Sequence, residues 1–414
     1  MGVYYRNPVQ ELLDGLIAQG IFGSLPRQAV YVAGMLVFAL VVLGGFVMPF
    51  AGIVTWVERR VMARIQSRVG PNRPGPAGFF VWLADGIKSL LKEDIIPRAA
   101  DGPLFRFAPY LVFAGFLLTF VVLPFGSQLV VADMNVGILY VTAVTGFVVV
   151  GILMAGWASN NKWSLLGGIR SAAQIVSYEI PAGLSIFPVV MLSGTLSIQG
   201  IIRAQGAAPW HWWIFHSPFT FVAFFVLFIS LLAEGNRAPF DLPEAESELV
   251  SGFSTEYSGM RYLLFYMAEY GNLYVMGAIA SALFLGGWQV PAALHGDPVV
   301  RAVAELACFQ AKALFWVFFM IWLRWTVPRI RVDQMMSMCW KYLVPIAFVN
   351  LLGVATWMVF FPDDTVIPRW ALFGLACGIF LLFVRRVIFH IRRARMPLGF
   401  KPVLQGASLI YGRR

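Results

Sequence analysis

Charged residues are scarce in this 414-residue sequence: Asp, Glu, Lys and Arg make up 13% of it, whereas hydrophobic residues make up 59%. An ordinary soluble domain has about a quarter of its residues charged, and the mean hydropathy here is +0.75. Such a chain has too little polar surface to cover a water-soluble globule of its size. The composition excludes intrinsic disorder, argues against a nucleic-acid-binding protein despite the net charge of +10, and favours a membrane protein.

Cysteine and histidine are also rare, with three and four residues. Cys308, Cys339 and Cys377 lie far apart without a CxxC pair, so neither a disulfide framework nor a thiolate-bound cluster is expected. The histidines have no metal-binding spacing, and His211 and His216 flank a Trp-rich stretch typical of an interfacial loop. No GxGxxG or Walker A segment occurs. We therefore expect no FMN, iron–sulfur cluster or metal bound by this chain.

Long apolar runs recur along the chain and predict an all-α polytopic membrane protein, because a barrel would need short alternating strands. Residues 1–28 are expected to form an N-terminal segment outside the membrane, with an interfacial helix. An eight-span core over residues 29–361 precedes an extra span and a basic cytoplasmic tail over 362–414. The nine expected spans are 29–57, 107–131, 134–158, 170–193, 217–234, 261–288, 309–327, 342–361 and 367–385.

The distribution of basic residues predicts the orientation of these spans. With the N-terminus outside, the inner segments hold 25 of the 31 Lys and Arg residues. Basic residues concentrate on the cytoplasmic side of membrane proteins, so we expect the N-terminus outside and the C-terminus in the cytoplasm. The net positive charge is then explained mainly by the basic residues that orient the spans, and it does not indicate a polyanionic partner. The six remaining basic residues are Arg6, Arg27, Arg203, Arg301, Lys312 and Arg369.

The first inner loop runs from Glu58 to Arg106 and has two distinct parts. Its Pro/Gly-rich stretch, residues 70–76, should be a stiff, non-helical connector. The following stretch has an amphipathic pattern that fits a helix lying in the membrane interface. A basic loop that only fixes orientation is the alternative, and the pattern leaves both open. The polar face comprises Asp85, Lys88, Ser89 and Lys92, and the apolar face Phe80, Leu83, Ile87 and Leu91.

The loop after the fifth expected span is unusually acidic. Six of the 21 acidic residues fall within residues 234–256, against the single cation Arg237. A solvated acidic loop is one interpretation. Apolar residues are interleaved with the acids, however, which favours a segment folded back into the protein. Crowded carboxylates in a low dielectric share protons, as a proton relay requires.

Two expected spans contain acidic residues in their interiors. The fourth carries Arg170, Gln174 and Glu179, and the sixth carries Glu269. A charge at a helix centre costs about 2.5–3.5 kcal/mol on insertion scales, so such residues normally face a polar interior and serve function. The alternative is a neutral Glu bonded to a neighbouring helix. Pro181 should also free a carbonyl near Glu179 that can hold water.

Five motifs, in this order, identify a family that the sequence resembles. They are VERRVMARIQSRVGPNRPGP with LADGIKSLLKED, GIRSAAQIVSYEIP, AEGNRAPFDLPEAESELVSGFSTEYSG, and IWLRWTVPRIRVDQ. They resemble the H-type membrane subunit of proton-pumping NADH:quinone oxidoreductase, respiratory complex I, over about residues 31–361. The resemblance implies a protein of the bacterial inner membrane. Its expected partners are other membrane-arm subunits, the quinone-site and iron–sulfur subunits of the peripheral arm, and lipids, and no nucleic acid is expected among them. Spans 2–6 resemble a proton half-channel.

The resemblance also assigns roles to residues. It implies an entrance and part of a chamber for a quinone substrate, menaquinone or ubiquinone, and a chain of carboxylates that couples quinone reduction to proton translocation. The residues that match the chamber and its mouth are Glu58, Arg59, Gln66, Arg68, Asp85 and Lys88. Those that match the carboxylate chain and its cations are Glu179, Glu234, Asp241, Glu244, Glu246, Glu248, Glu269, Arg170 and Arg237.

Two other functions fit parts of the pattern. A homologous membrane subunit of an energy-converting hydrogenase would share the intramembrane acids, but the chamber-mouth segment at residues 58–93 favours a quinone user. A stand-alone secondary transporter with a broken fourth helix is the second alternative. The acidic inner loop argues against a transporter, because transport does not need such a cluster on one surface.

Overall fold

The computed structural model describes residues 43–241, 246–291 and 298–360, together with isolated positions at 30–37 and 371–386. All regular structure in these residues is helical. The expected N-terminal interfacial helix and most of the ninth span and basic tail lie outside the described residues. The division into an N-terminal segment, an eight-span core and a C-terminal extension therefore stays a prediction.

The chain forms α-helices joined by short 3₁₀ or π turns. The turns are η1 (Leu43–Val47), η2 (Pro76–Gly78), η3 (Pro209–His211), η4 (Trp213–Phe215), η5 (Gly252–Ser254) and η7 (Cys339–Leu343). The α-helices are α3 (Met48–Ile65), α4 (Val81–Leu91), α5 (Gly102–Thr119), α6 (Gly137–Ala158), α7 (Lys162–Ser193), α8 (Ile198–Arg203), α9 (Pro218–Glu234), α10 (Glu246–Leu249), α11 (Gly259–Phe284), α12 (Pro298–Thr326), α13 (Val332–Met338) and α14 (Val344–Phe360).

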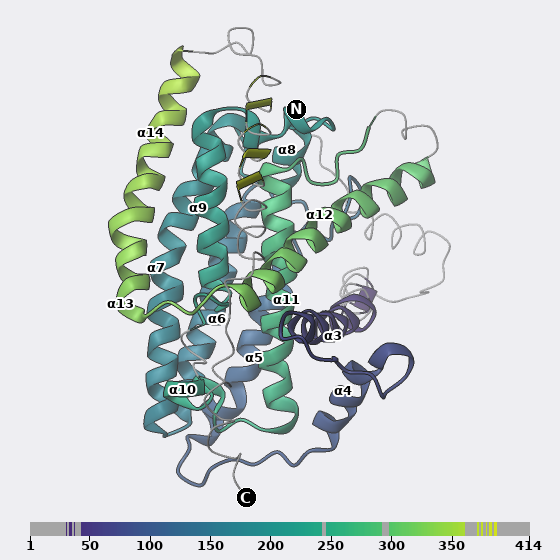
Figure 1. Ribbon diagram of the computed structural model, residues 1–414, viewed down its shortest axis with the longest axis vertical. Helices are drawn as coiled ribbons and strands as arrows, with labels where there is room; N and C mark the ends of the chain where they lie inside the picture. Colours follow the sequence, from purple (N-terminus) through teal and green to yellow (C-terminus); the bar gives the residue numbers. More distant parts are fainter. Residues whose placement is uncertain are drawn as a thin grey trace, which may run out of the picture.

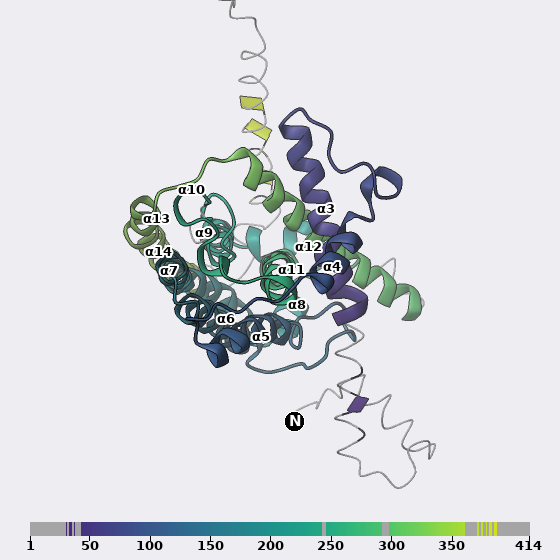
Figure 2. The same ribbon diagram turned by 90° about the horizontal axis from the view of Figure 1, so that it is seen from below.

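The long helices form a bundle around α11. Helices α5, α6, α7, α9 and α11 run roughly along the long axis, and α12 slants across α11 (Figure 1). The view along the axis shows α11 between the α5–α6–α7–α9 group on one side and the α3–α12 pair on the other (Figure 2). Helix α3 runs across the axis of the upright helices. Polar groups on α11 are therefore enclosed by other helices.

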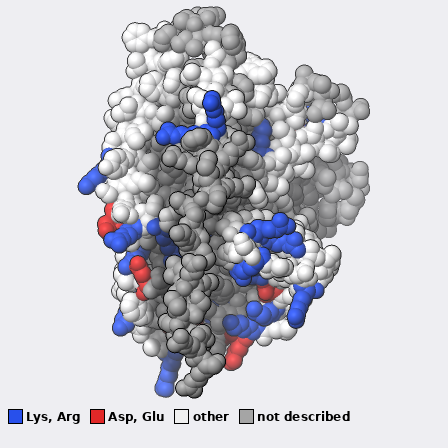
Figure 3. All heavy atoms as spheres, in the orientation of Figure 1, with Lys and Arg blue, Asp and Glu red and all other residues white. Residues whose placement is uncertain are grey.

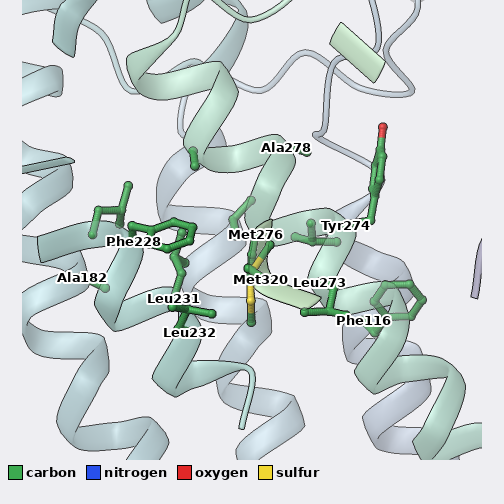
Figure 4. Close-up of a cluster of buried hydrophobic side chains, with 14 of the residues drawn as sticks. Phe116, Ala182, Phe228, Leu231, Leu232, Leu273, Tyr274, Met276, Ala278 and Met320 are labelled. Carbon is green, nitrogen blue, oxygen red and sulfur yellow. The ribbon is translucent and has the colours of Figure 1, made fainter. Parts of the chain in front are cut away.

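Apolar packing around the middle of α11 holds this arrangement together. Phe228, Leu231 and Leu232 of α9 lie close to Met276 of α11 and Met320 of α12 (Figure 4), and all five are at most 7% exposed. Within a membrane, lipid chains are as apolar as these side chains, so close van der Waals packing supplies most of the association energy.

Five described helices are long and apolar enough to cross a membrane. Helix α11 has 26 residues but is not among them, since Glu269 and Asn272 lower its hydropathy. The all-helical, multi-span class is confirmed, whereas the count of nine spans and the half-channel formed by spans 2–6 stay predictions. The five are Gly102–Thr119, Gly137–Ala158, Lys162–Ser193, Val299–Thr326 and Val332–Phe360.

The expected second span extends too far, because its helix ends at Thr119 and not near residue 131. Pro124 and Gly126 follow, and both disfavour a continuing helix. The apolar residues beyond them remain buried without being helical, as Val122 and Leu123 are 2% and 1% exposed. An apolar run thus indicates burial here and not helix length.

The Pro/Gly-rich connector and the amphipathic helix both occur where the sequence predicts them. Residues 66–80 form turns with one 3₁₀ turn, and Gly78 has a φ of +72°. A side chain at Gly78 would collide with the Pro71 carbonyl, so the turn requires glycine. Helix α4 packs against α3 and α11, while Leu83, Ile87 and Leu91 on its apolar face remain exposed.

Candidate functional site

A buried cluster of ionic side chains lies where α3, α11 and α12 meet the loop after α9. Arg237 of that loop lies 3.1 Å from Glu269 Oε1 and 3.8 Å from Glu58 Oε2. Glu58 also pairs with Arg324 of α12, whose Nη1 lies 2.9 Å from its Oε1. Arg237 and Glu58 are 2% and 4% exposed, so these charges attract each other strongly in a low dielectric.

Arg237 is held chiefly by charge and by an aromatic ring. Its guanidinium carbon lies 4.2 Å from the centre of the Tyr270 ring, a favourable cation–π distance. Burial alone would lower the pKa of Arg237, but Glu269, Tyr270 and Glu58 raise it above its ordinary value. Arg237 therefore stays a cation at any working pH. Its nitrogen atoms make no hydrogen bond of good geometry with the described residues, so the ion pairs and the ring hold it in place.

Asp241 attaches the same loop to the segment between α12 and α13. Arg329 Nη2 donates to Asp241 Oδ2 at 3.1 Å, and the Ile330 amide donates to the Pro239 carbonyl at 3.1 Å. Burial raises the pKa of the Asp241 carboxyl, although Arg324, Arg329 and Arg237 oppose this shift. Asp241 is thus an acid whose protonation responds to small changes in the nearby arginines.

The backbone of the loop is fixed to α7 by one buried side chain. Gln174 Nε2 donates to the carbonyl oxygens of Ala233 at 2.7 Å and Phe240 at 2.8 Å, and to Asn236 Oδ1 at 3.1 Å. Gln174 is fully buried. A short loop needs such partners because its own carbonyls lie inside the protein, and these bonds place Arg237 and Asp241 beside α11.

A second group of carboxyls lies between α6, α7, α9 and α11. Glu179 and Glu234 are close enough to interact electrostatically, and both line a cavity of about 50 Å³. Thr145, whose hydroxyl donates to the Thr142 carbonyl at 2.7 Å, lines the same cavity. The rest of its lining is mostly apolar, so the two acids share a small compartment within an apolar bundle.

A second cavity of about 50 Å³ connects this compartment with the ionic cluster. Glu234 and Asn272 line both cavities, whereas Glu269 lines the second cavity and not the first. Tyr262 and Tyr266 of α11, with Asn236 and Ser254, add further polar groups to its lining. The ionic residues therefore form a spatial sequence that runs from α3 to α7. It begins at the cluster of Glu58, Arg237 and Glu269, continues to Glu234 and ends at Glu179.

The described part of the acidic loop contains one further pair. Arg170 Nη1 lies 2.8 Å from Glu248 Oε2, and the Glu248 side chain is 57% exposed. Glu248 is thus a surface residue and not part of the buried cluster. Glu244 and the Glu246 side chain lie outside the described residues, so the expected crowding of carboxylates in this loop stays a prediction.

The residues assigned to the chamber and its mouth separate into three places. Glu58 belongs to the buried cluster, whereas Arg59 of α3 pairs with Asp85 of α4 at 2.7 Å. Gln66 and Arg68 are exposed and bond each other at 2.7 Å. Lys88 lies on the exposed side of α4. The space-filling view shows most charged side chains of this face in its lower half, both on the side of α3 and α4 and along the opposite edge (Figure 3).

Sequence reasoning missed several members of the cluster. Arg324 and Arg329 lie in the last of the five motifs and were otherwise only counted among the inner basic residues, because nothing in the neighbouring sequence indicates which acids they meet. Tyr270 lies directly beside Glu269 in the sequence, and only the packing of Arg237 on its ring distinguishes it from a core aromatic.

The carbonyl freed by Pro181 is occupied by a side chain. Proline lacks the amide that would bond the carbonyl four residues earlier, and the Cys339 thiol donates to that Ser177 carbonyl at 3.1 Å. A carbonyl oxygen can accept two hydrogen bonds, so the expectation that it also holds water beside Glu179 stays a prediction. The contact attaches α7 to the π turn η7, next to the Tyr178 hydroxyl, which donates to the Met335 carbonyl at 2.9 Å.

Comparisons with known proteins agree with one another. The family model for NADH dehydrogenase matches residues 37–355. The H subunit of NADH-quinone oxidoreductase from Anaeromyxobacter dehalogenans is 55% identical over 349 residues, covering 80% of this chain and 84% of the relative. The H subunits of Chlorobium luteolum and Dehalococcoides mccartyi strain CBDB1 are 45% and 47% identical, covering 80% and 84% of this chain and 90% and 94% of those relatives.

Proposed function

Since this chain belongs to the NADH dehydrogenase family, as an H subunit of proton-translocating NADH-quinone oxidoreductase, we propose that it couples quinone reduction to proton translocation through its buried carboxylates. It also forms the entrance and part of the chamber for the quinone, of either the menaquinone or the ubiquinone class. The chain acts only within the complex, beside other membrane-arm subunits, the quinone-site and iron–sulfur subunits of the peripheral arm, and lipids.

The observation that carries this proposal is the continuity between the ionic cluster and the two cavities. Glu269 belongs to the cluster and lines one cavity, while Glu234 lines both. A carboxyl that lines two adjoining cavities can take a proton from a group in one and release it to a group in the other. This arrangement supports a route from Glu58 through Glu269 and Glu234 to Glu179.

Quinone reduction supplies the drive for this route. Two electrons and two protons convert a neutral quinone to a neutral quinol. When the two protons come from groups at the chamber wall, where Glu58 and Arg237 lie, the wall becomes more negative by the protons it has given up. A change in charge at this cluster alters the field at Glu269 and then at Glu234, because both lie in a low dielectric. The demand is large, since each charge moved against the membrane potential costs about 2.3 kcal/mol per 100 mV.

The chamber mouth is proposed to lie between α3 and α4. The Arg59–Asp85 pair joins these two helices, while Gln66, Arg68 and Lys88 face outward near it. The exposed apolar face of α4 fits the membrane interface, where an isoprenoid quinone can enter from the bilayer. Asp241, Glu244, Glu246, Glu248, Arg170 and Arg237 are proposed to complete the coupling chain at this end.

Glu234→Gln tests the route, because Gln keeps the size of the side chain but cannot carry a proton. In the purified complex in liposomes, we expect proton pumping linked to quinone reduction to fall by about 10²-fold or more, the scale of one lost acid–base group. NADH oxidation by ferricyanide should be unchanged, since it uses only the peripheral arm.

The matched control is Glu93→Gln, which removes a carboxyl on an exposed side chain of the inner loop. It should pump at the rate of the unmodified complex. Normal pumping by Glu234→Gln would refute the route, and loss of the ferricyanide reaction together with pumping would identify a failure of assembly. In that case, Glu179→Gln in the neighbouring cavity repeats the test.

A further inference from the structure

Three tyrosines form a ladder on one face of α11. Tyr262, Tyr266 and Tyr270 are spaced four residues apart, so they lie above one another on the helix. The ring centres of Tyr262 and Tyr266 are 6.2 Å apart, and those of Tyr266 and Tyr270 are 4.5 Å apart. The Tyr266 hydroxyl donates to the Tyr270 hydroxyl at 3.2 Å. The ladder is therefore connected through oxygen atoms as well as through rings.

The two ends of the ladder lie in different environments. Tyr262 is 41% exposed at the start of α11, whereas Tyr270 is 5% exposed and its ring supports Arg237. Between them, Tyr266 lines the cavity that contains Glu269, Glu234 and Asn272. Tyr270 does not line this cavity, so Tyr266 is the step between the cavity and the cluster.

The cluster offers an acceptor at the inner end of the ladder. Glu58 Oε2 is buried and makes no hydrogen bond with the described residues, its ion-pair contact with Arg237 being 3.8 Å long. Arg237 brings Glu58 and Tyr270 into one cluster, since it lies 3.8 Å from Glu58 Oε2 and 4.2 Å from the centre of the Tyr270 ring. A carboxylate with a vacant acceptor atom beside a phenol can receive that phenol's proton.

We propose that Tyr266 and Tyr270 form a proton bridge between the cavity and the Glu58–Arg237 cluster, with the hydroxyl of Tyr266 as its essential step. This inference rests on the proposed function and adds a route that does not pass through direct contact between carboxyls. The route supplies protons to the cluster when quinone reduction draws them from the chamber wall.

The transfer conserves protons at each phenol. A protonated Glu234 or Glu269 carboxyl releases a proton through the cavity to the Tyr266 oxygen, while Tyr266 gives its own proton to the Tyr270 oxygen. Tyr270 in turn gives its proton to the Glu58 carboxylate. One carboxyl has then lost a proton, Glu58 has gained one, and both tyrosines end as they began. Both phenols stay neutral when these steps are concerted, which avoids a charged phenolate inside the protein.

Aromatic packing is the competing explanation of the ladder, and phenylalanine separates the two. Phe keeps the ring and its stacking but removes the hydroxyl. Tyr274, one turn further along α11, provides the matched control. Its ring packs against Phe46 and Phe50, with centres 5.1 Å away in both cases, and its hydroxyl interacts with Gln310 of α12. Like Tyr270 it is buried, at 0% exposed against 5%, but it lies outside the ladder.

The experiment compares Tyr266→Phe, Tyr270→Phe and Tyr274→Phe in the whole complex in liposomes, with a short-chain quinone as acceptor. Tyr266→Phe and Tyr270→Phe should lower quinone turnover by about five- to tenfold, the equivalent of one lost hydrogen bond. They should also raise the ratio of rates in H₂O and D₂O, which packing alone would not change. Tyr274→Phe should match the unmodified complex in both measurements.

Normal turnover and a normal isotope ratio in Tyr266→Phe would overturn the bridge, as would equal losses in Tyr274→Phe. If Tyr266→Phe fails to assemble, judged by the ferricyanide reaction, 3-fluorotyrosine at position 266 keeps the hydroxyl and changes its acidity. An unchanged turnover with fluorotyrosine would then overturn the bridge. Loss of pumping in Glu234→Gln with normal Tyr266→Phe refutes the bridge alone, whereas normal behaviour in both refutes the proposed function as well.

Discussion

At the scale of single residues, Arg237 decides whether the cluster is stable. It is the cation shared by Glu58 and Glu269, and only 2% of its surface is exposed. Buried ion pairs contribute little net stability, but removing one partner leaves an uncompensated charge. The carboxyls can therefore take part in proton transfer only while this cation remains in place.

We expect Arg237→Met to destabilise the protein by about 3–5 kcal/mol, because Glu58 and Glu269 then lose their shared counter-ion. The amount of assembled complex and its temperature of half-inactivation measure the effect. Arg237→Met combined with Glu269→Gln should recover part of the loss, since fewer charges remain unpaired. The control Arg98→Met removes an exposed cation and should change neither value. A stable single variant would show that the cluster does not depend on this cation.

The sequence predicted most of these acids but not their partners. Glu58 and Arg237 lie 179 positions apart, and the resemblance assigned them to two different parts of the machinery. Their meeting results from the fold, which places α3 beside the loop after α9. Pairings across such distances depend on tertiary packing, so no local pattern could reveal that Arg324 and Arg329 belong to the same cluster.

At the scale of helices, glycine sets how closely α6 and α7 approach. A Cβ on Gly156 would lie 2.7 Å from the Ser164 carbonyl and 3.1 Å from Gly168 Cα. Small residues allow this kind of backbone contact between membrane helices. The contact fixes α7, and with it Glu179, against the helix that supplies Thr145.

Gly156→Ala should separate α6 from α7 and destabilise the complex by about 1–3 kcal/mol, the usual cost of overpacking. Gly146→Ala is the matched control on the same helix, because a Cβ there meets nothing within 4 Å. Alanine favours a helix over glycine by about 0.5–1 kcal/mol, so the control should be neutral or slightly stabilising. The temperature of half-inactivation distinguishes the two variants, and equal values would contradict the close contact.

The helices themselves were largely predictable from apolar runs, whereas their ends were not. Helix α7 begins at Lys162, where the Asn161 side chain accepts a bond from the Trp163 amide, eight residues before the expected span. Asparagine is a good N-cap, but a hydropathy pattern does not detect it. Conversely, the helix of the second expected span ends at Thr119, shortly before Pro124 and Gly126, whereas the apolar pattern continues to about residue 131.

At the scale of the whole molecule, the loops divide between the two ends of the bundle. Helices α4 and α10 lie toward one end, and α8 lies toward the other (Figure 1). The basic loop between α3 and α5 thus shares an end with the acidic loop. The excess of Lys and Arg expected on the cytoplasmic side predicts that this end of the bundle faces the cytoplasm.

Cysteine labelling in spheroplasts tests this orientation, in a chain whose three native cysteines are replaced by serine. Arg73 in the first inner loop and Ala204 after α8 are both exposed. Intact spheroplasts are treated with a membrane-impermeant maleimide, and remaining thiols are then labelled in SDS. We expect Ala204→Cys to be blocked and Arg73→Cys to be labelled only in SDS, because the bilayer shields the cytoplasmic end. The reverse result would place the proposed quinone entrance and carboxylate chain on the outer side and would contradict the proposed contact with a cytoplasmic peripheral arm.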